Sequence, residues 1–402
     1  MPTSDEAFVF ARLADGVRIV GRYRYRRSEG SRAIGEFGYA GSWLAYAGCF
    51  PLDPVNLPLS DEVFQTTKRG CLFGPLADAT PDRWGRELIH RRYPGRTLSP
   101  VEWLLESGPD RVGCLDFSAT TTPTLQPVHR LGIGSIEAIA SEFQKIEAGQ
   151  PADPDAESIY KAGTSLGGAR PKAVIEIGSA LWIAKFERAT DTFDQCSAEH
   201  ATMMLARACG IDAAETRLID VGPRKAVLVK RFDRSIAPDA RPTAHFLSAL
   251  SLLNEDETSP EGSYYAIAAE LLRHSAAPQE DRAELFRRMV FNVLCGNRDD
   301  HLKNHALLRG DKGWRLSPAF DIVPQPDMPP AQAIALGRSG VFPSLANCMS
   351  RCGDFGLSEE AATSEIRRLC EVTASWEVFF ARSGTPQTTI GRIAPAFNLA
   401  GA

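Results

Sequence analysis

A short polar stretch in the C-terminal half of the chain holds residue types that phosphoryl transfer needs. Asp299 and Asn304 lie close together in FNVLCGNRDDHLKNHALL (291–308), and Asp321 follows in PAFD (318–321). In a phosphoryl-transfer site of the protein-kinase kind, one carboxylate orients the attacking hydroxyl group, while an amide oxygen and a second carboxylate hold Mg²⁺ against the nucleotide phosphates. The two carboxylates must be different residues, because a magnesium ligand stays ionised whereas a base must be free to accept a proton.

The residues around this pair leave two questions open. His301 and Lys303 lie between the aspartate and the asparagine; we assign Lys303 to the catalytic set with Asp299, and His301 to the nucleotide-binding set. Asp300 adjoins Asp299, so the choice of the base depends on register. The alternative to a catalytic loop is a polar loop between a buried helix and a strand, because Asp and Asn commonly bond to their own backbone in loops.

A glycine-interrupted stretch precedes an apolar, β-branched run in KAGTSLGGARPKAVIEI (161–177). Glycines let the backbone approach a phosphate closely, and exposed amides can cradle its oxygens. An ordinary hairpin is the alternative, since glycines also mark tight turns. The glycines concerned are Gly163, Gly167 and Gly168.

Lys185 lies in the otherwise apolar strand pattern LWIAKF. A lysine there is unfavourable unless its ammonium group has an anionic partner. A kinase-like site supplies two partners, the nucleotide phosphates and a glutamate on the next helix. That helix is expected from about Ser197 to Cys209 and carries Glu199. The alternative is an edge position from which Lys185 reaches water.

A hairpin pattern follows at 216–219 and 226–229, and it leads into KRFDRS. Here a small β-rich lobe would pass to a helical lobe, and adenine would lie against the crossover, using backbone groups and an aromatic neighbour such as Phe232. Phe232 in a plain hydrophobic core is the alternative.

From residue 243 onward the pattern is helical, with helices expected over 264–274, 281–294, 358–372 and 376–381. The 281–294 segment is apolar over a wide face, which predicts a mostly buried helix that delivers the polar loop rigidly. The proline-rich segment after Asp321 cannot form long regular structure and could be an ordered loop over the site.

The first part of the chain carries no constellation with chemistry of its own. Short strands are expected at 8–10, 17–25 and 34–46, followed by a helix led by Thr80 and another that starts near Ser99. The charged residues on the first of these helices face either a partner or solvent; they are Asp82, Arg83 and Arg86.

Charge limits the classes of partner. The formal net charge is −5 and the pI is about 5.9, which argues against broad electrostatic binding of nucleic acid by this chain alone. Arg22, Arg24 and Arg26 alternate with tyrosines, as one face of a strand would. Such a stripe is ordinarily solvated, and contact with nucleic acid or a partner is the alternative.

The nine cysteines include no CxxC pair, which fits reduced, mostly buried thiols in a cytosol. The N-terminus lacks a basic segment followed by an apolar run, so we expect no secretory signal. No apolar stretch reaches the length needed to span a bilayer. We therefore expect a soluble, cytoplasmic protein.

The order of these motifs resembles the HipA family, the kinase toxins of HipA–HipB toxin–antitoxin modules. FGPLADATPDRWGR and ESGPDRVGCLDF are similar to the family's N-terminal subdomain, and SLGGARPK to its phosphate loop. LWIAKF resembles its nucleotide-lysine strand, VKRFDR its hinge, and GNRDDHLKNHALL with SPAFDIVP its catalytic loop and metal-binding aspartate.

The resemblance implies a role for each matching residue. Asp299 would be the catalytic base, Asn304 and Asp321 the Mg²⁺ ligands, and Lys185 the partner of the nucleotide phosphates. Ser165 would be an autophosphorylated serine whose modification ejects the loop and shuts the enzyme off, with Thr164 as the alternative acceptor. The phosphate loop would bind the nucleotide through Ser165, Gly167, Gly168, Ala169 and Lys172, and the Arg170-Pro171 pair before Lys172 would stiffen it. The hinge against adenine and ribose would be Val229, Lys230, Arg231, Phe232 and Asp233.

We therefore predict an α+β, protein-kinase-like two-lobe fold with an additional N-terminal β-containing subdomain and an all-α C-terminal lobe. The expected domains are 1–130, 131–235 and 236–402. The implied function is ATP- and Mg²⁺-dependent phosphorylation of a serine or threonine on a translation-related protein such as an aminoacyl-tRNA synthetase. A HipB-like DNA-binding antitoxin would supply the contact with DNA. A small-molecule phosphotransferase and a catalytically silent subunit of a repressor complex are the alternatives.

Overall fold

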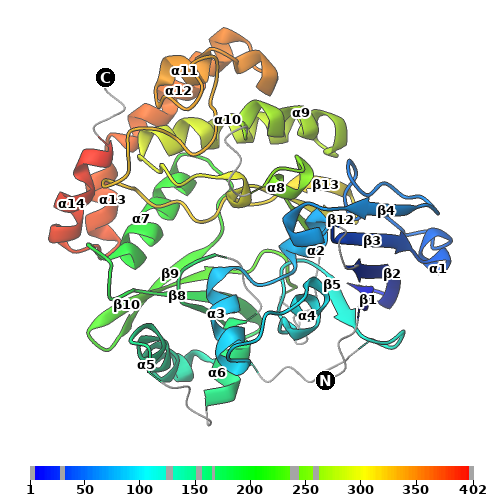
Figure 1. The fold of residues 1–402 in the computed structure, drawn as a ribbon. Helices are drawn as coiled ribbons and strands as arrows, with labels where there is room; N and C mark the ends of the chain where they lie inside the picture. The colour runs from blue at the N-terminus through cyan, green and yellow to red at the C-terminus, as the bar shows by residue number, and fades with distance from the viewer. Residues whose placement is uncertain are drawn as a thin grey trace. The chain divides into compact units, whose positions relative to one another are not determined.

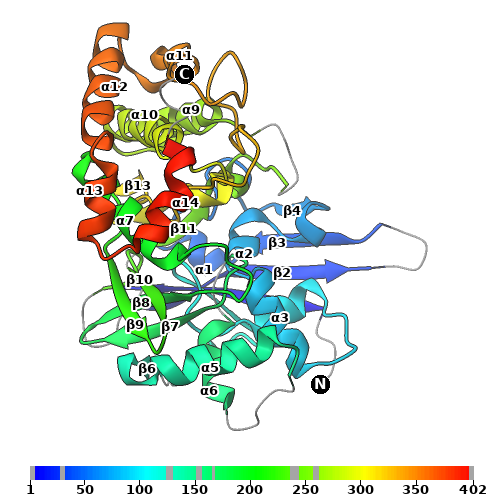
Figure 2. The same ribbon diagram turned by 90° about the vertical axis from the view of Figure 1, so that its left-hand side faces the viewer.

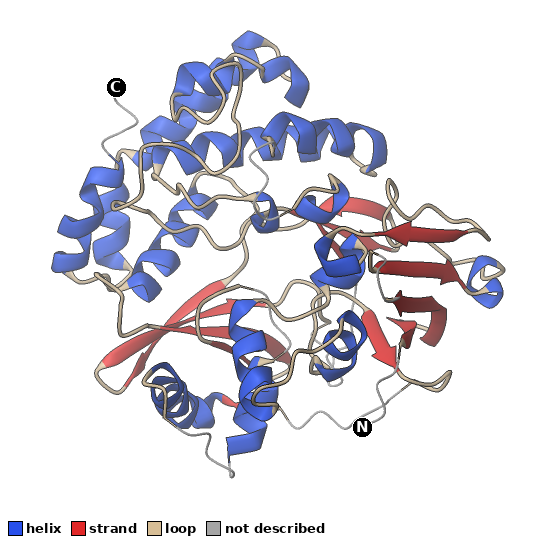
Figure 3. Ribbon diagram, in the orientation of Figure 1, coloured by secondary structure: helices blue, strands red, loops and turns tan. Residues whose placement is uncertain are grey.

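The structure is a computed structural model in which two compact units are distinguished. The first contains Met1–Ala184, Asp233–Asp256 and Leu308–Asp311, and the second contains Lys185–Phe232, Glu257–Leu307 and Lys312–Ala402. Both units combine helices and strands (Figure 3), which agrees with the α+β prediction. The residues that the structure describes are 5–27, 32–123, 130–150, 156–164, 168–235, 244–256 and 262–397.

The first unit begins with a five-stranded antiparallel sheet in the order β4-β3-β2-β1-β5 (Figure 1). Its inward face is lined by alternate residues such as Val9, Tyr23 and Phe37, which are fully buried; the period of two follows from the pleat of a strand. The strands are β1 (Glu6–Leu13), β2 (Gly16–Arg26), β3 (Ile34–Tyr39), β4 (Val63–Thr66) and β5 (Leu115–Ser118).

The three arginines that alternate along β2 form ion pairs with glutamates of β1 and β3. Arg24 forms an ion pair with Glu6 at 3.1 Å, Arg22 lies 3.7 Å from the same carboxylate, and Arg26 pairs with Glu36 at 2.8 Å. Two carboxylates thus offset part of the positive charge of the three arginines, so the stripe is a strand face of mixed charge.

Short helices and further strands complete the first unit. Helix α4 begins where the sequence predicts, because Ser99 and Glu102 form a reciprocal capping box. The parallel neighbours β6 and β7 are followed by β8, whose last two residues belong to the second unit. The elements are α1 (Gly41–Leu44), α2 (Gly74–Asp78), α3 (Arg83–Arg92), α4 (Pro100–Glu106), β6 (Leu131–Gly132), α5 (Ile136–Glu147), α6 (Glu157–Gly163), β7 (Lys172–Ile177), β8 (Ala180–Phe186), β11 (His245–Ser248) and α8 (Ala249–Leu252).

The second unit is mostly helical. Helix α10 packs against α9 and α12, as Figure 2 shows, and its interior face is buried almost without interruption from Leu285 to Leu294. The predicted 264–274 and 281–294 helices are therefore confirmed. The elements are α7 (Gln195–Ala208), β9 (Thr216–Val221), β10 (Arg224–Lys230), α9 (Tyr264–His274), α10 (Pro278–Leu294), η4 (Leu302–Asn304), β12 (Ala306–Gly310), β13 (Gly313–Leu316), α11 (Leu345–Met349), α12 (Glu359–Thr373), α13 (Trp376–Arg382) and α14 (Gln387–Phe397). The last three residues of β12 belong to the first unit.

Three local expectations need amendment. The strand expected over 34–46 ends at Tyr39, because α1 follows. The helix expected to be led by Thr80 begins at Arg83, with Asp82 at its N-cap. The C-terminal part, expected to be all-α, is predominantly helical and also carries the short strands β11, β12 and β13, since alternating runs such as GWRL fit a strand.

The described helices include none that is long and apolar enough to cross a membrane. All nine cysteines are free thiols, and all except Cys49 and Cys370 are buried, as the sequence predicts.

Candidate active site

Lys185 is the centre of a charge cluster in the second unit, in which Glu199 is buried and Asp321 is partly exposed. It lies near the end of β8 with 7% of its surface exposed. Its Nζ lies 2.6 Å from Glu199 Oε1 and 2.6 Å from Asp321 Oδ1. The ion pair with a glutamate on the next helix is therefore confirmed, and an exposed edge position is wrong. The direct contact with Asp321 was not foreseen from the sequence.

Local sequence explains why Glu199 reaches the lysine. The carboxylate of Asp194 accepts a hydrogen bond from the Ser197 N–H at 2.8 Å and so caps α7. Glu199 then lies on the buried face of this helix and is 3% exposed. Burial alone lowers the pKa of Lys185, but the charges of Asp321 and Glu199 outweigh it and hold the pKa above its usual value. The ammonium group therefore stays protonated at neutral pH.

Asp321 has a left-handed backbone conformation, with φ of 59°. Aspartate tolerates this region better than most residues, although it still costs free energy. The backbone just before it is fixed: the Ala319 N–H donates to the Asp212 carbonyl at 2.7 Å, and the Ala319 carbonyl accepts from the Ala214 N–H at 2.9 Å. A strained conformation held in this way directs the carboxylate toward Lys185.

Asp299 and Asn304 are joined through the backbone of the loop between α10 and β12. Asn304 lies in the short 3₁₀ turn η4, and its Nδ2 donates to the Asp299 carbonyl at 3.2 Å. This bond fixes which end of the amide faces the Asp299 carbonyl. The Oδ1 atom of Asn304 faces the other way and can act as an acceptor or metal ligand. Asp299 itself is exposed, whereas Asn304 is 7% exposed.

The electrostatic surroundings raise the pKa of the Asp299 carboxyl above its usual value. Partial desolvation is the main cause; the charge of His301 acts in the opposite direction, while Asp321 and Asp300 both raise the pKa further. Asp299 thus lies within electrostatic reach of Asp321. An exposed carboxylate with a raised pKa is suited to accepting a proton.

Asp300 has a different environment although it is the neighbour of Asp299. It is 3% exposed, accepts a hydrogen bond from the Tyr264 hydroxyl, and lies 3.0 Å from His305 Nε2. The Asn292 Nδ2 donates to the same Tyr264 hydroxyl at 2.9 Å. Asp300 is therefore engaged in a buried network beneath the loop, which favours Asp299 as the base.

Two further loop residues were named from the sequence. The buried Nδ1 atom of His301 has no hydrogen-bond partner among the described residues, so it can accept or donate a bond to a ligand. Lys303 is half-buried in η4. Both belong to the second unit with Lys185 and Asp321.

The proline-rich segment after Asp321 is irregular, as predicted, and it braces the loop. The Gln325 N–H donates to the Gly296 carbonyl at 2.9 Å, and the Gln332 Nε2 donates to the Asn297 carbonyl at 3.1 Å. Gly296 has φ of 64°, and a Cβ there would lie 2.6 Å from the Ala396 oxygen, so glycine is required.

The predicted hinge residues lie at the end of β10. Val229 and Arg231 are buried, and Lys230 Nζ forms an ion pair with Glu215 at 2.8 Å. The Phe232 ring is half-buried, and its centroid lies 5.7 Å from that of Phe320. This contact places the hinge aromatic beside the residue that precedes Asp321. The sequence analysis did not single out Phe320; the only feature that could have pointed to it is its position directly before Asp321 in PAFD.

Asp233 lies in the first unit, where its carboxylate is buried. Its Oδ2 atom accepts from the Gly113 N–H at 2.8 Å and from Arg234 at 2.8 Å. The Arg234 guanidinium also donates to the Gly113 carbonyl at 2.9 Å. These bonds give the side chain a structural role within the first unit.

The predicted phosphate-loop residues also belong to the first unit. Ser165 and Gly167 lie outside the described residues. Thr164 ends α6, Gly168 has φ of 92°, Ala169 follows it, and Lys172 begins β7. Because a helix precedes the segment and a strand follows it, the alternative of a hairpin is wrong.

Comparison with known proteins gives a consistent result. The profile of the HipA-like C-terminal domain matches residues 164–376, and that of the HipA N-terminal domain matches residues 19–118. The chain is 32% identical over 372 residues to the "Putative kinase Y4mE" of Sinorhizobium fredii, which covers 80% of this chain and 79% of that protein. It is 25% identical over 142 residues to the serine/threonine-protein kinase toxin HipA of Shewanella oneidensis, or 31% of this chain and 33% of that one.

A solved structure shares the fold. A chain in the complex of Shewanella oneidensis HipA, HipB and operator DNA superimposes with a TM-score of 0.72 and 20% identity, covering 98% of this chain and 95% of that chain. Since the C-terminal profile spans more than half of the sequence and Y4mE aligns over most of it, this chain belongs to the HipA family.

Proposed function

We propose that the chain is an ATP- and Mg²⁺-dependent protein kinase that phosphorylates serine or threonine. The observation that carries the proposal is Lys185, which is buried and paired with both Glu199 and Asp321. In protein kinases a lysine held by a helix glutamate pairs with the nucleotide phosphates, and an aspartate and an asparagine hold the metal. Asp299, Asn304 and Asp321 lie in the same unit as this lysine.

The donor set fits magnesium. Asp321 offers a carboxylate. Asn304 offers its amide oxygen, because its amide nitrogen is the atom that donates to the Asp299 carbonyl. Hard oxygen ligands of this kind suit Mg²⁺, which binds through a small number of protein groups together with substrate phosphates and water. When bound, Mg²⁺ would neutralise charge on the phosphates. Asn304 and Asp321 would hold it, and Lys185 and His301 would bind the nucleotide.

Asp299 would act as the base. Its exposed carboxylate can reach the hydroxyl group of an incoming protein, orient it and accept its proton. The neighbouring Asp300 would keep the loop in place through Tyr264 and His305. Lys303, close to Asp299 in the same loop, would stabilise negative charge on the transferred group.

The relatives suggest the biological setting. By analogy with the toxin HipA and with the HipA–HipB–DNA complex of Shewanella oneidensis, we propose a HipB-like antitoxin as partner and DNA contact only through it. The net charge of −5 is in keeping with this division. A translation-related protein such as an aminoacyl-tRNA synthetase would be the target, and Ser165, or else Thr164, the site of autophosphorylation.

Incubation with γ-labelled ATP, Mg²⁺ and a cell lysate, followed by mass spectrometry, separates the candidate functions. The proposal predicts label on serine or threonine of one or a few proteins and loss of label when Mg²⁺ is chelated. Label on a metabolite with none on protein would favour a small-molecule phosphotransferase. A chain that binds no nucleotide would be a catalytically silent subunit.

A further inference from the structure

The first turn of α3 is joined to Gly168, which lies in the predicted phosphate loop of the same unit. Asp82 stands at the N-cap of α3 but makes no capping bond to its own helix. Its Oδ2 atom instead accepts a hydrogen bond from the Gly168 N–H at 2.6 Å. In return, the Trp84 N–H, one of the amides that a helix leaves unpaired at its N-terminus, donates to the Gly168 carbonyl at 3.4 Å.

These two bonds form a reciprocal clasp. In a capping box, a side chain and a backbone amide exchange bonds within one helix end. Here the exchange joins two segments that are distant in the sequence: the N–H and the carbonyl of Gly168 bond to Asp82 and Trp84 at the N-terminus of α3. The bond from Gly168 to a carboxylate is charge-assisted and therefore among the stronger ones.

Close packing on both sides supports the clasp. A Cβ on Gly85 would lie 3.1 Å from the Thr164 oxygen, so α3 also approaches the residue that ends α6. A Cβ on Gly168 would overlap with Lys172 Nζ, which means that the lysine ammonium lies against the clasped glycine. The buried face of α3 is anchored by Trp84, whose ring meets Phe143 at 4.9 Å.

We propose that Asp82 is a positioning residue for the nucleotide: it fixes Gly168, and with it the approach of Lys172, against the first turn of α3. The inference rests on the proposed function, because only a nucleotide-binding protein would offer Lys172 and Gly168 a phosphate group as a ligand. It also gives a function to Asp82 in the ATPDRWG motif. From the sequence alone, the charged residues of this motif could face either a partner or solvent. Gly168 and Lys172, held in this way, should contact the phosphates equally before and during transfer, so the loss of Asp82 should appear in KM.

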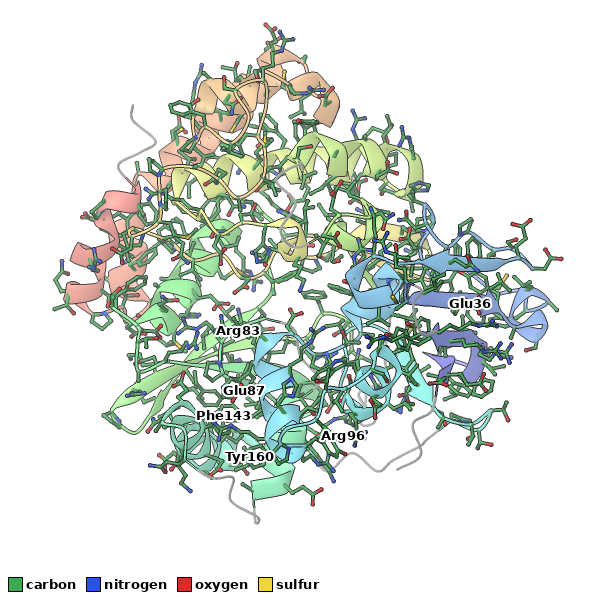
Figure 4. The ribbon with its side chains drawn as sticks, viewed as in Figure 1. Glu36, Arg83, Glu87, Arg96, Phe143 and Tyr160 are labelled. Carbon is green, nitrogen blue, oxygen red and sulfur yellow. The ribbon has the colours of Figure 1, made fainter. Side chains whose placement is uncertain are left out.

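The test uses Asp82→Ala, Asp82→Asn and the control Glu87→Gln in the full-length protein. Glu87 is an exposed residue farther along α3 than Arg83 (Figure 4), and it pairs with Arg91. Asn keeps an acceptor oxygen and should restore most of the behaviour. The readouts are hydrogen exchange at the Gly168 amide, the Kd for ATP by calorimetry, and the separate values of kcat and KM.

For Asp82→Ala we expect exchange at Gly168 to quicken about tenfold or more, since a bond to a charged acceptor is lost. The Kd and KM for ATP should rise by a similar factor, with kcat changed by less than about threefold; Glu87→Gln should match the wild type. Unchanged exchange in Asp82→Ala would overturn the clasp, and faster exchange with unchanged Kd and KM would overturn the positioning role. If the wild type binds no ATP, the proposed function fails while the exchange measurement still decides the clasp.

Discussion

At the scale of single residues, two neighbouring aspartates differ in what surrounds them. Asp299 is exposed and has a raised pKa, whereas Asp300 is buried and bonded to Tyr264 and His305. Two identical side chains thus have different surroundings: Asp299 faces solvent, and Asp300 is held by buried hydrogen bonds. From the sequence alone the two could not be separated, since burial depends on the course of the loop.

Replacing Asp299 by Asn should reduce phosphoryl transfer by about 10²–10⁴-fold, the range of general-base catalysis, and leave ATP affinity nearly unchanged. Transfer from labelled ATP and calorimetry would measure the two effects. Asp311→Asn, at an exposed turn, serves as the control. Near-normal transfer by the Asp299 variant would remove it from the role of base.

The raised pKa of Asp299 also predicts a pH dependence. The base must be ionised, so kcat should fall as pH decreases through a value above the usual 3.8 of an aspartate. A pKa raised on folding means that the ionised form destabilises the fold, so Asp299→Asn should equal or exceed the wild type in stability at neutral pH and lose that advantage below pH 3.8. A variant that retains the acid limb of the profile would show that another group titrates.

At the scale of elements, α10 and the hydrogen bonds of Tyr264 hold the loop that carries Asp299 and Asn304. The hydroxyl of Tyr264 contacts Asp300 and accepts from Asn292 on α10. The Asn297 Nδ2 continues the chain of bonds to Asn292 Oδ1 at 3.0 Å. Buried hydrogen-bond networks rigidify the segments that they join.

Tyr264→Phe should lower the free energy of unfolding by about 1–3 kcal/mol, because Asp300 and Asn292 lose a buried partner. Denaturant unfolding would measure it. Tyr265→Phe is the matched control, since Tyr265 is only half-buried and its ring contacts Arg351 at 4.1 Å. Equal stability of the two variants would mean that the hydroxyl bonds contribute nothing.

The elements that the sequence predicted correctly share a clear signal. Helices α9 and α10 have strong apolar periodicity, and α4 has its capping box. Helix α14 was missed because Gly391 and Pro395 interrupt its pattern, although Ile390 and Ile393 are buried at helical spacing. The contact of Lys185 with Asp321 could not be predicted, because it depends on the left-handed backbone of Asp321.

At the scale of the whole molecule, the order of motifs predicted the family, and the comparisons confirmed it. Charge and cysteine usage gave only broad classes. The three-part division of the chain and the roles of the site residues stay predictions. The identity of the protein substrate also stays a prediction, since it depends on a partner and not on periodicity.

The central claim is that Lys185, Asn304 and Asp321 bind one magnesium nucleotide, and calorimetric titration with ATP, with and without Mg²⁺, tests it most directly. The account predicts that Lys185→Met weakens binding about tenfold or more in both conditions, whereas Asn304→Ala and Asp321→Ala chiefly abolish the gain that Mg²⁺ gives. Lys312→Met, at an exposed position of the second unit, should match the wild type. Affinity and magnesium dependence that are unchanged in all three site variants would contradict the account.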